Sequence, residues 1–184
     1  MLNQDHRSQL LRIARQSIEA TLDGRRLALD ASELHPDIQR PSGAFVSLHT
    51  RGGELRGCIG SIHPVAPLYE AVASNAANAA FRDPRFHPLR KDELTNVHIE
   101  ISVMSPIEPV SAVEEIEVGR DGLIIRRGSR AGLLLPQVAT EYGWDREAFL
   151  RHTCAKAGLP FDAWRSADCR IERFSAEVFG ETWS

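Results

Sequence analysis

Hydrophobic and polar residues alternate in the first half of the chain, and a period of two predicts β-strands. Residues 96–105 alternate cleanly, and residues 43–50 and 55–60 have strand composition. The last two segments are separated by a turn signal that contains Gly52 and Gly53. We therefore predict a β-hairpin over residues 43–60 and a further strand over residues 96–105.

The register of this hairpin follows if Gly52 and Gly53 form a two-residue loop. Counting outwards then places Ser47 opposite Cys58. Because side chains alternate across a strand, one face is predicted to be core. The predicted core face carries Val46, Leu48, Leu55 and Ile59. The other face carries Ser47 and Cys58, with His49 opposite Arg56, and Glu100 joins them if the strands pair.

Apolar residues recur at helical spacing over residues 4–22, which predicts an amphipathic helix. Residues 67–81 are rich in alanine and read as a helix that ends near Asp83, because the residue before a proline disfavours helical geometry. So many alanines let a helix lie close to a sheet, which fits a strand that contains glycine. Residues 23–42 read as a loop with a helical turn.

The second half of the chain repeats this order of hairpin, helix and strand. Its predicted strands and helix span 113–118, 122–126, 131–135, Asp145 to Gly158, and 169–179. The predicted class is α+β, with a largely antiparallel sheet and packed helices. We expect one domain over residues 4–182, with subdomains at about 4–110 and 111–182 that arise from a duplicated hairpin–helix–strand unit.

Composition and net charge disfavour nucleic-acid and membrane partners. The chain has 184 residues, 42% of them hydrophobic and 26% charged, which is ordinary for a globular protein. A net charge of -3 argues against a general nucleic-acid partner. No apolar run is long enough to span a membrane and the N-terminus does not resemble a signal peptide, so we expect a cytoplasmic protein without a membrane partner.

The sequence lacks the common motifs for disulfide frameworks, cysteine zinc sites, dinucleotide binding and zinc proteases. The 3 cysteines are odd in number and lack C-x-x-C spacing, which predicts neither a disulfide framework nor a cysteine zinc site. Neither G-x-G-x-x-G nor H-E-x-x-H is present. No metal site is predicted from sequence spacing, a His/Glu metal site assembled in space stays open, and the cofactor stays unknown. Cys154 lies on the apolar stripe of its predicted helix, so we expect it to be buried and inert.

The segment Leu55-Arg56-Gly57-Cys58-Ile59-Gly60 carries the candidate chemistry. A buried cysteine usually acts as a small hydrophobe, but a nearby cation such as Arg56 favours the reactive thiolate. Gly57 and Gly60 weaken a strand unless a ligand, a helix or another chain approaches closely. Arg82 and Arg85 follow the Ala-rich helix. Either they interact favourably with the negative end of the helix dipole, or they bind a carboxylate or phosphate.

Several stretches, in order, resemble the AMMECR-type domain family over about residues 10–182. They are the segment around Cys58, then Ala80-Phe81-Arg82-Asp83-Pro84-Arg85-Phe86, Ile99 to Pro106, Gly122 to Ile125, Leu135 to Val138, Gly143 to Asp145, and Lys156 to Leu159. The prokaryotic form of this family resembles protein A of the AmmeMemoRadiSam set. The resemblance implies a Memo-like protein and a radical SAM protein as partners. His63 and His87 depart from the usual pattern, which argues against a family-wide role for either.

Three functions remain open. In the first, an enzyme or enzyme subunit acts in a modification or redox pathway, with Cys58 as nucleophile or redox thiol, Arg56 as its activator and Glu100 beside them. An anionic substrate would then contact Arg82, Arg85, Ser47, Gly57 and Gly60. The second is a non-catalytic adaptor that presents the same face to a partner protein. The third, a role on nucleic acid, is disfavoured by the net charge.

Overall fold

A computed structural model describes residues 2–182, and the chain divides into two compact units. The first unit comprises the chain up to Met104 and from Glu177 onward, and the second comprises Ser105–Ala176. Strand β7 (Arg170–Gly180) contributes to both units. Helices and antiparallel strands make up each unit, so the α+β class is confirmed. No helix in the described residues is long and apolar enough to cross a membrane.

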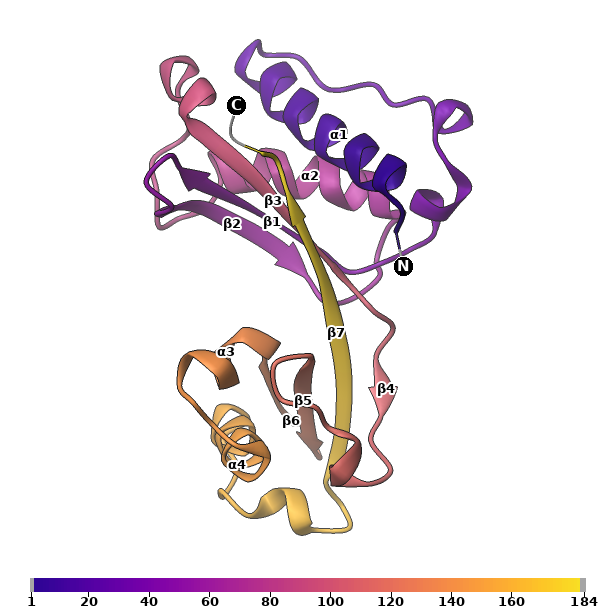
Figure 1. The fold of residues 1–184 in the computed structure, drawn as a ribbon, viewed down its shortest axis with the longest axis vertical. Coiled ribbons are helices and arrows are strands. Elements are labelled where there is room, and N and C mark those ends of the chain that lie inside the picture. Colours follow the sequence, from indigo (N-terminus) through magenta and orange to yellow (C-terminus); the bar gives the residue numbers. More distant parts are fainter. Residues whose placement is uncertain (1, 183–184) are drawn as a thin grey trace. The chain divides into compact units, whose positions relative to one another are not determined.

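The first unit contains the predicted hairpin and the strand that follows it (Figure 1). Strand β1 lies between β2 and β3 and is antiparallel to both. Ser47 on β1 pairs with Cys58 on β2, as predicted, and with Glu100 on β3. These strands span Ala44–Thr50 (β1), Leu55–Ser61 (β2) and Val97–Met104 (β3).

A β-bulge near the hairpin turn changes the predicted register. Leu48 pairs with Gly57, but His49 pairs with Leu55, so Arg56 is the extra residue on β2. The prediction that His49 faces Arg56 is therefore wrong. The prediction that Leu55 belongs to the core is also wrong, because its side chain is exposed. An inserted residue reverses the side-chain alternation beyond it, and counting from the turn could not reveal that.

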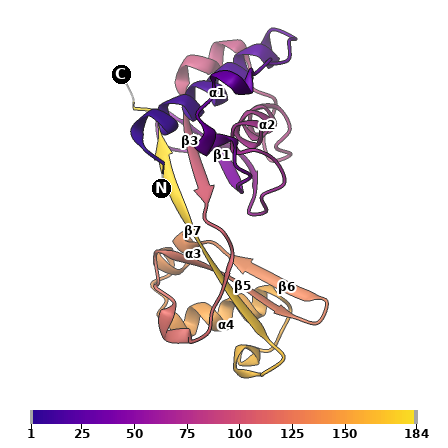
Figure 2. The ribbon, with the colours of Figure 1, turned by 90° about the vertical axis from the view of Figure 1, so that its right-hand side faces the viewer.

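Two helices cover the apolar face of this sheet, α1 (Gln4–Leu22) and α2 (Leu68–Phe81) (Figures 1 and 2). The predicted Ala-rich helix packs directly on the hairpin, because a Cβ on Gly57 would lie 2.2 Å from the carbonyl oxygen of Ala79. The core between helices and sheet includes Leu10, Ile18, Val46, Leu48, Val72, Ile99 and Ile101.

Short 3₁₀ segments connect the helices to the strands of the first unit. The loop between α1 and β1 contains η1 (Ala31–Glu33) and η2 (Pro36–Gln39), in agreement with the predicted helical turn. A third segment, η3 (Lys91–Asn96), precedes β3. Asn3 caps helix α1, because its side chain accepts a hydrogen bond from the backbone N–H of His6.

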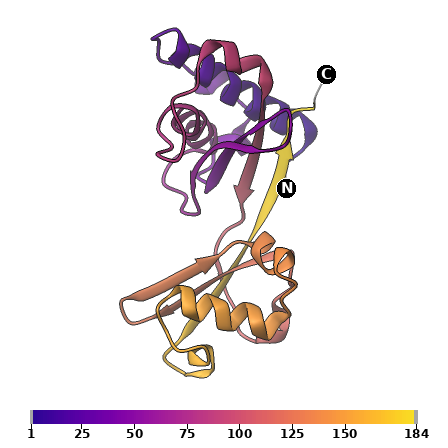
Figure 3. The same cartoon turned by 90° about the vertical axis from the view of Figure 1, so that its left-hand side faces the viewer.

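The second unit repeats the order of hairpin, helix and strand (Figure 3). Strand β5 lies between β6 and β7, and β4 pairs with β7. Helix α4 packs against the β5–β6 hairpin over a core that includes Phe149, Leu150 and Cys154. The burial predicted for Cys154 is confirmed. The elements are β4 (Glu108–Pro109), η4 (Val113–Glu115), β5 (Asp121–Arg127), β6 (Arg130–Leu134), α3 (Pro136–Glu141), α4 (Arg146–Lys156) and η5 (Ala163–Arg165).

Two predictions for the second unit were wrong or incomplete. Residues 113–118 begin as the 3₁₀ segment η4 instead of a strand, because the carboxylate of Glu115 accepts a hydrogen bond from the backbone N–H of Ala112. Helix α3 was not predicted. It begins with Pro136 at its first position, where a missing N–H costs nothing.

Candidate functional site

Four polar side chains form a cluster on the sheet face of the first unit that points away from α1 and α2. We call this cluster, Ser47, His49, Cys58 and Glu100, the polar face. The Ser47 hydroxyl donates a hydrogen bond to Cys58 Sγ over 3.1 Å. Glu100 pairs with Ser47 on the opposite side, and its carboxylate lies 3.8 Å from Nε2 of His49. The structure therefore brings together Ser47, Cys58 and Glu100, which were predicted as site residues.

The polar face is half-buried. The His49 side chain is 28% exposed and the Glu100 side chain is 39% exposed. Nε2 of His49 is buried and has no hydrogen-bond partner among the described residues. A hydroxyl that donates to sulfur can also donate to a thiolate, which is the nucleophilic form of cysteine. The cluster thus combines a potential nucleophile, a hydroxyl donor and an imidazole–carboxylate pair.

Arg56 lies beside this cluster in sequence but is bound elsewhere. Its Nε and Nη2 donate to the two carboxylate oxygens of Glu93, over 3.1 and 3.2 Å, and Nη2 lies 3.1 Å from Nδ1 of His87. The Arg56 side chain is only 8% exposed, and its Nη1 is buried without a hydrogen-bond partner among the described residues. These hydrogen bonds from Arg56 outweigh burial and lower the pKa of Glu93. The bulge directs Arg56 into this bidentate ion pair.

The backbone of Cys58 is held by Asp83 and Arg85. The Asp83 carboxylate accepts hydrogen bonds from the Cys58 N–H over 2.9 Å and from Nη2 of Arg85 over 2.7 Å. Arg85 also donates to the Cys58 carbonyl over 3.3 Å. Asp83 is buried, and the Arg85 guanidinium holds the pKa of this carboxyl far below its usual range. The outer edge of β2 is thereby satisfied at Cys58, which fixes the position of the thiol.

Arg82 does not join Arg85 in a clamp. Its side chain lines a hollow of about 860 Å³ over α2, together with Arg26 and His63. Neither Arg26 nor Arg82 makes an ion pair with another residue in the described part of the chain. The two arginines that the sequence placed in one site therefore have different surroundings.

We call residues 55–60 and 80–86 together the signature, and its two glycines pack against other groups. Gly57 lies beneath Ala79, as described above. A Cβ on Gly60 would lie 2.4 Å from the Phe45 ring and from the carbonyl oxygen of Ala44. Both glycines thus permit close packing within the first unit. Their predicted contact with a substrate stays a prediction.

The other two thiols differ from Cys58 in their surroundings. Cys154 is fully buried, and burial raises its pKa. Burial also raises the pKa of Cys169, although the nearby Arg127 opposes the shift. A raised pKa leaves less thiolate at neutral pH. These two cysteines are natural internal references for Cys58.

Sequence reasoning missed Glu93 and Asp83, the carboxylates that hold the predicted arginines. Glu93 is 37 positions from Arg56, and nothing in the local pattern pairs them. Asp83 was noted only as the residue before Pro84, where the helix should end. An acidic residue between two arginines did offer a signal for the second pair.

Comparisons with known proteins agree with the resemblance seen in the sequence. The AMMECR1 family model matches residues 11–179. A protein of Thermococcus gammatolerans is 44% identical over 183 residues, which cover 95% of this chain and 89% of that protein. A protein of Aeropyrum pernix is 46% identical over 182 residues, with 94% of this chain and 78% of that protein covered.

A solved structure is also similar. The crystal structure of an uncharacterised protein from Pyrococcus horikoshii aligns with a TM-score of 0.83 and 40% sequence identity. The alignment covers 99% of this chain and 94% of that one. The names of these relatives state no activity.

Proposed function

This chain belongs to the AMMECR1 family, and from that premise we propose that it is a thiol-dependent enzyme or enzyme subunit in which Cys58 is the reactive residue. The observation that carries the proposal is the hydrogen bond of 3.1 Å from the Ser47 hydroxyl to the Cys58 sulfur. A sulfur in this arrangement can attack an electrophilic centre while the hydroxyl stabilises its charge.

The other members of the polar face have distinct roles in this proposal. His49 and Glu100 lie 3.8 Å apart and form the pair that would accept the thiol proton, directly or through water. Arg56 acts as a positioning residue, because its ion pair with Glu93 anchors strand β2 two residues before Cys58. Asp83 and Arg85 likewise position Cys58 through its backbone.

Arg82 is a candidate for binding an anionic group, but the hollow that it lines contains no residue of the polar face, so this binding would be separate from the chemistry at Cys58. Arg56 and Arg85 are each neutralised by a carboxylate, whereas Arg82 has no ion-pair partner among the described residues. A guanidinium without an internal partner can bind a carboxylate or phosphate in a bidentate manner. The hollow of about 860 Å³ that it lines lies within the usual size range for small-molecule sites.

We further propose that this chemistry takes place in the cytoplasm, within a modification or redox pathway. Its partners would be a Memo-like protein and a radical SAM protein. The support for these partners is the family resemblance alone.

The alternative is a non-catalytic adaptor, and one observation favours it. Asp83 and Arg85, two charged residues of the signature, hold the backbone of β2 at Cys58. The signature therefore also has a structural role. In that case the polar face would contact a partner protein without forming a covalent bond. The two functions differ in whether Cys58 is modified.

Mass spectrometry of the protein after digestion into peptides distinguishes the enzyme from the adaptor. The purified chain would be incubated with the Memo-like and radical SAM proteins of the same genome, and with small-molecule extract from its cells. A thiol-dependent enzyme predicts a mass increase on the Cys58 peptide of wild type and of the matched Cys169→Ser variant, but none in Cys58→Ser. Equal binding of a partner by wild type and Cys58→Ser, without any adduct, would establish the adaptor function instead.

A further inference from the structure

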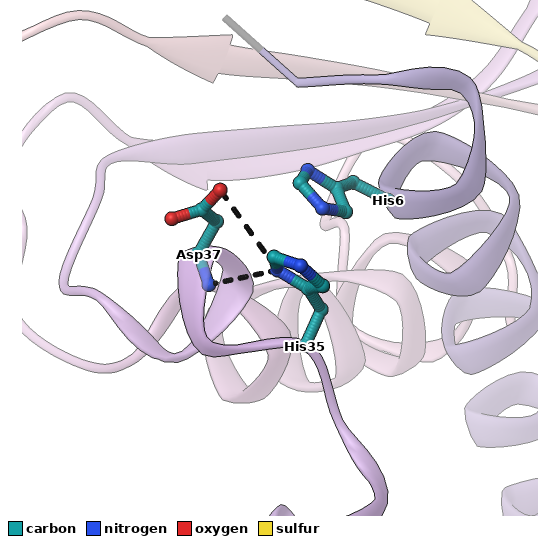
Figure 4. Close-up of side chains that lie close together, drawn as sticks. All are labelled: His6, His35 and Asp37. Atoms are coloured by element: carbon teal, nitrogen blue, oxygen red, sulfur yellow. Dashed lines mark hydrogen bonds and ion pairs between the residues drawn. The ribbon is translucent and has the colours of Figure 1, made fainter.

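Three potential metal ligands lie close together at the beginning of α1. His6 is on the first turn of this helix, His35 directly precedes η2, and Asp37 is within η2. One ligand atom from each of the three residues lies within 4.8 Å of the other two. Figure 4 shows the two imidazole rings and the carboxylate gathered around one small space. No sequence motif links residues so far apart in the chain, so spacing could not predict the cluster.

His6 provides the strongest indication that something binds here. Its side chain is 96% buried, since the residue is only 4% exposed. Its Nε2 is buried and has no hydrogen-bond partner among the described residues. Buried polar atoms are nearly always paired, with protein, water or a ligand. The ring of His6 lies against the ring of His35, with 4.0 Å between the centroids.

His35 and Asp37 supply the other donors. Nδ1 of His35 accepts a hydrogen bond from the Asp37 N–H over 3.2 Å, so this nitrogen carries the lone pair that a metal requires. The same nitrogen lies 3.8 Å from the Asp37 carboxylate oxygen (Figure 4). In a tetrahedral site with bonds of about 2.0–2.2 Å, ligand atoms are roughly 3.3–3.5 Å apart. The 3.8 Å between Nδ1 of His35 and the Asp37 carboxylate oxygen is therefore close to the required spacing.

We propose that His6 Nε2, His35 Nδ1 and Asp37 form a site for a divalent first-row transition metal ion, with Zn²⁺ as the best match to two imidazoles and one carboxylate. His35 and Asp37 have side chains 50% and 45% exposed, so they can close on an ion bound to the buried His6. A fourth position stays open to water from a hollow of about 520 Å³ that His6 and His35 line.

Binding requires two rearrangements. Nδ1 of His6 now accepts a long hydrogen bond of 3.4 Å from the Asn3 N–H, so the ring proton must move from Nε2 to Nδ1 and this bond is lost. The metal also replaces the Asp37 N–H at Nδ1 of His35. In return, the ion links the start of α1 to the η2 segment. We therefore expect metal binding to stabilise the first unit.

Equilibrium dialysis tests the site directly. Tag-free full-length protein, first freed of metal with a chelator, would be dialysed against Zn²⁺, and Co²⁺ would be used to report coordination by visible absorption. His35→Gln and Asp37→Asn remove ligands at half-exposed positions where folding should survive. His63→Gln and Asp92→Asn are matched controls at exposed positions outside the cluster.

Wild type and both controls should bind one Zn²⁺ per chain and should show a melting temperature that rises with Zn²⁺ concentration. His35→Gln and Asp37→Asn should each weaken binding by at least about tenfold. Bound Co²⁺ should show four-coordinate visible bands without the charge-transfer absorption of a thiolate ligand. Absence of stoichiometric binding, undiminished binding in either ligand variant, or equal loss in the controls would overturn the proposal.

Discussion

At the scale of single residues, the surroundings of Cys58 explain why charge near a thiol does not by itself identify an activator. Arg56 is two positions away, yet its guanidinium is bound by Glu93. The backbone N–H and carbonyl of Cys58 are held by Asp83 and Arg85. Polar residues of the signature therefore fix the strand, and the side chain that contacts the sulfur is the Ser47 hydroxyl.

Replacement of Gly57 tests the close approach of α2. A Cβ at this position would lie 2.2 Å from the Ala79 carbonyl oxygen, so helix and strand would have to separate. We expect Gly57→Ala to lower the free energy of unfolding by about 1–3 kcal/mol. Gly52→Ala is the matched control, because its nearest neighbour would be Thr50 Oγ1 at 3.8 Å. Denaturant unfolding measures both, and equal stability of the two variants would contradict this packing.

Removal of the Arg56 charge tests the buried ion pair. Arg56→Met keeps most of the apolar stem but leaves Glu93 without its bidentate donor, which should cost about 1–3 kcal/mol in the free energy of unfolding. The exposed pair of Arg165 with Glu147 offers a control, because both side chains are more than half exposed. Arg165→Met should cost about 0–1 kcal/mol. Similar losses in urea unfolding of both variants would show that the Arg56 pair has no special weight.

At the scale of elements, periodicity predicted most of the regular structure. Helices α1, α2 and α4 were found because each has an apolar face, and the strands of both hairpins were found from their strand composition and the turn signals between them. The bulge at Arg56 was missed because a hairpin loop fixes register only up to the first irregularity. The segment at Val113 has strand-like composition, but a local cap by Glu115 decides its conformation.

The candidate site was predictable only in part for a related reason. Ser47 and Cys58 follow from the hairpin register, and Glu100 follows once the strands pair. Ion pairs such as Arg56 with Glu93 join segments whose separation is set by the tertiary fold. The proposed metal ligands His6 and His35 are likewise far apart in sequence, and the loop between α1 and β1 brings them together.

Helix α4 allows a test of capping. The Asp145 side chain accepts a hydrogen bond from the Ala148 N–H over 2.8 Å, whereas Asp162, at the start of η5, makes no such side-chain bond. Asp145→Ala should therefore lower the free energy of unfolding by about 1 kcal/mol. Asp162→Ala should change it by less. Thermal unfolding followed by circular dichroism compares the two, and a larger loss in Asp162→Ala would contradict the assignment of the cap.

At the scale of the whole molecule, buried and paired carboxylates should make stability depend on pH. Hydrogen bonds from arginine lower the pKa of Asp83 and Glu93 in the folded chain, and for Asp121 those from Arg120 and the Glu117 N–H outweigh the opposing effect of burial. An unfolded carboxyl binds a proton near pH 4, before these folded ones do. The stabilisation is thus complete above about pH 5 and is lost as pH falls towards the lowered values.

Denaturant unfolding across about pH 3 to pH 7 measures this dependence. The free energy of unfolding should fall steadily below about pH 5 in wild type, and Glu93→Gln should reduce the slope. Glu114→Gln, at an exposed position, is the control and should leave the slope unchanged. A slope that is the same in all three proteins would mean that the pair with Arg56 does not contribute to acid stability.

The most direct test of the central claim is the alkylation rate of each cysteine in the folded protein. Iodoacetamide labelling, followed over pH by peptide mass spectrometry, separates Cys58 from Cys154 and Cys169 within one molecule. We expect Cys58 to react fastest in wild type, Ser47→Ala to slow this reaction, and burial to protect the other two thiols. A Cys58 that stays unreactive until denaturant is added, in wild type and Ser47→Ala alike, would contradict the account and leave the signature as a structural device.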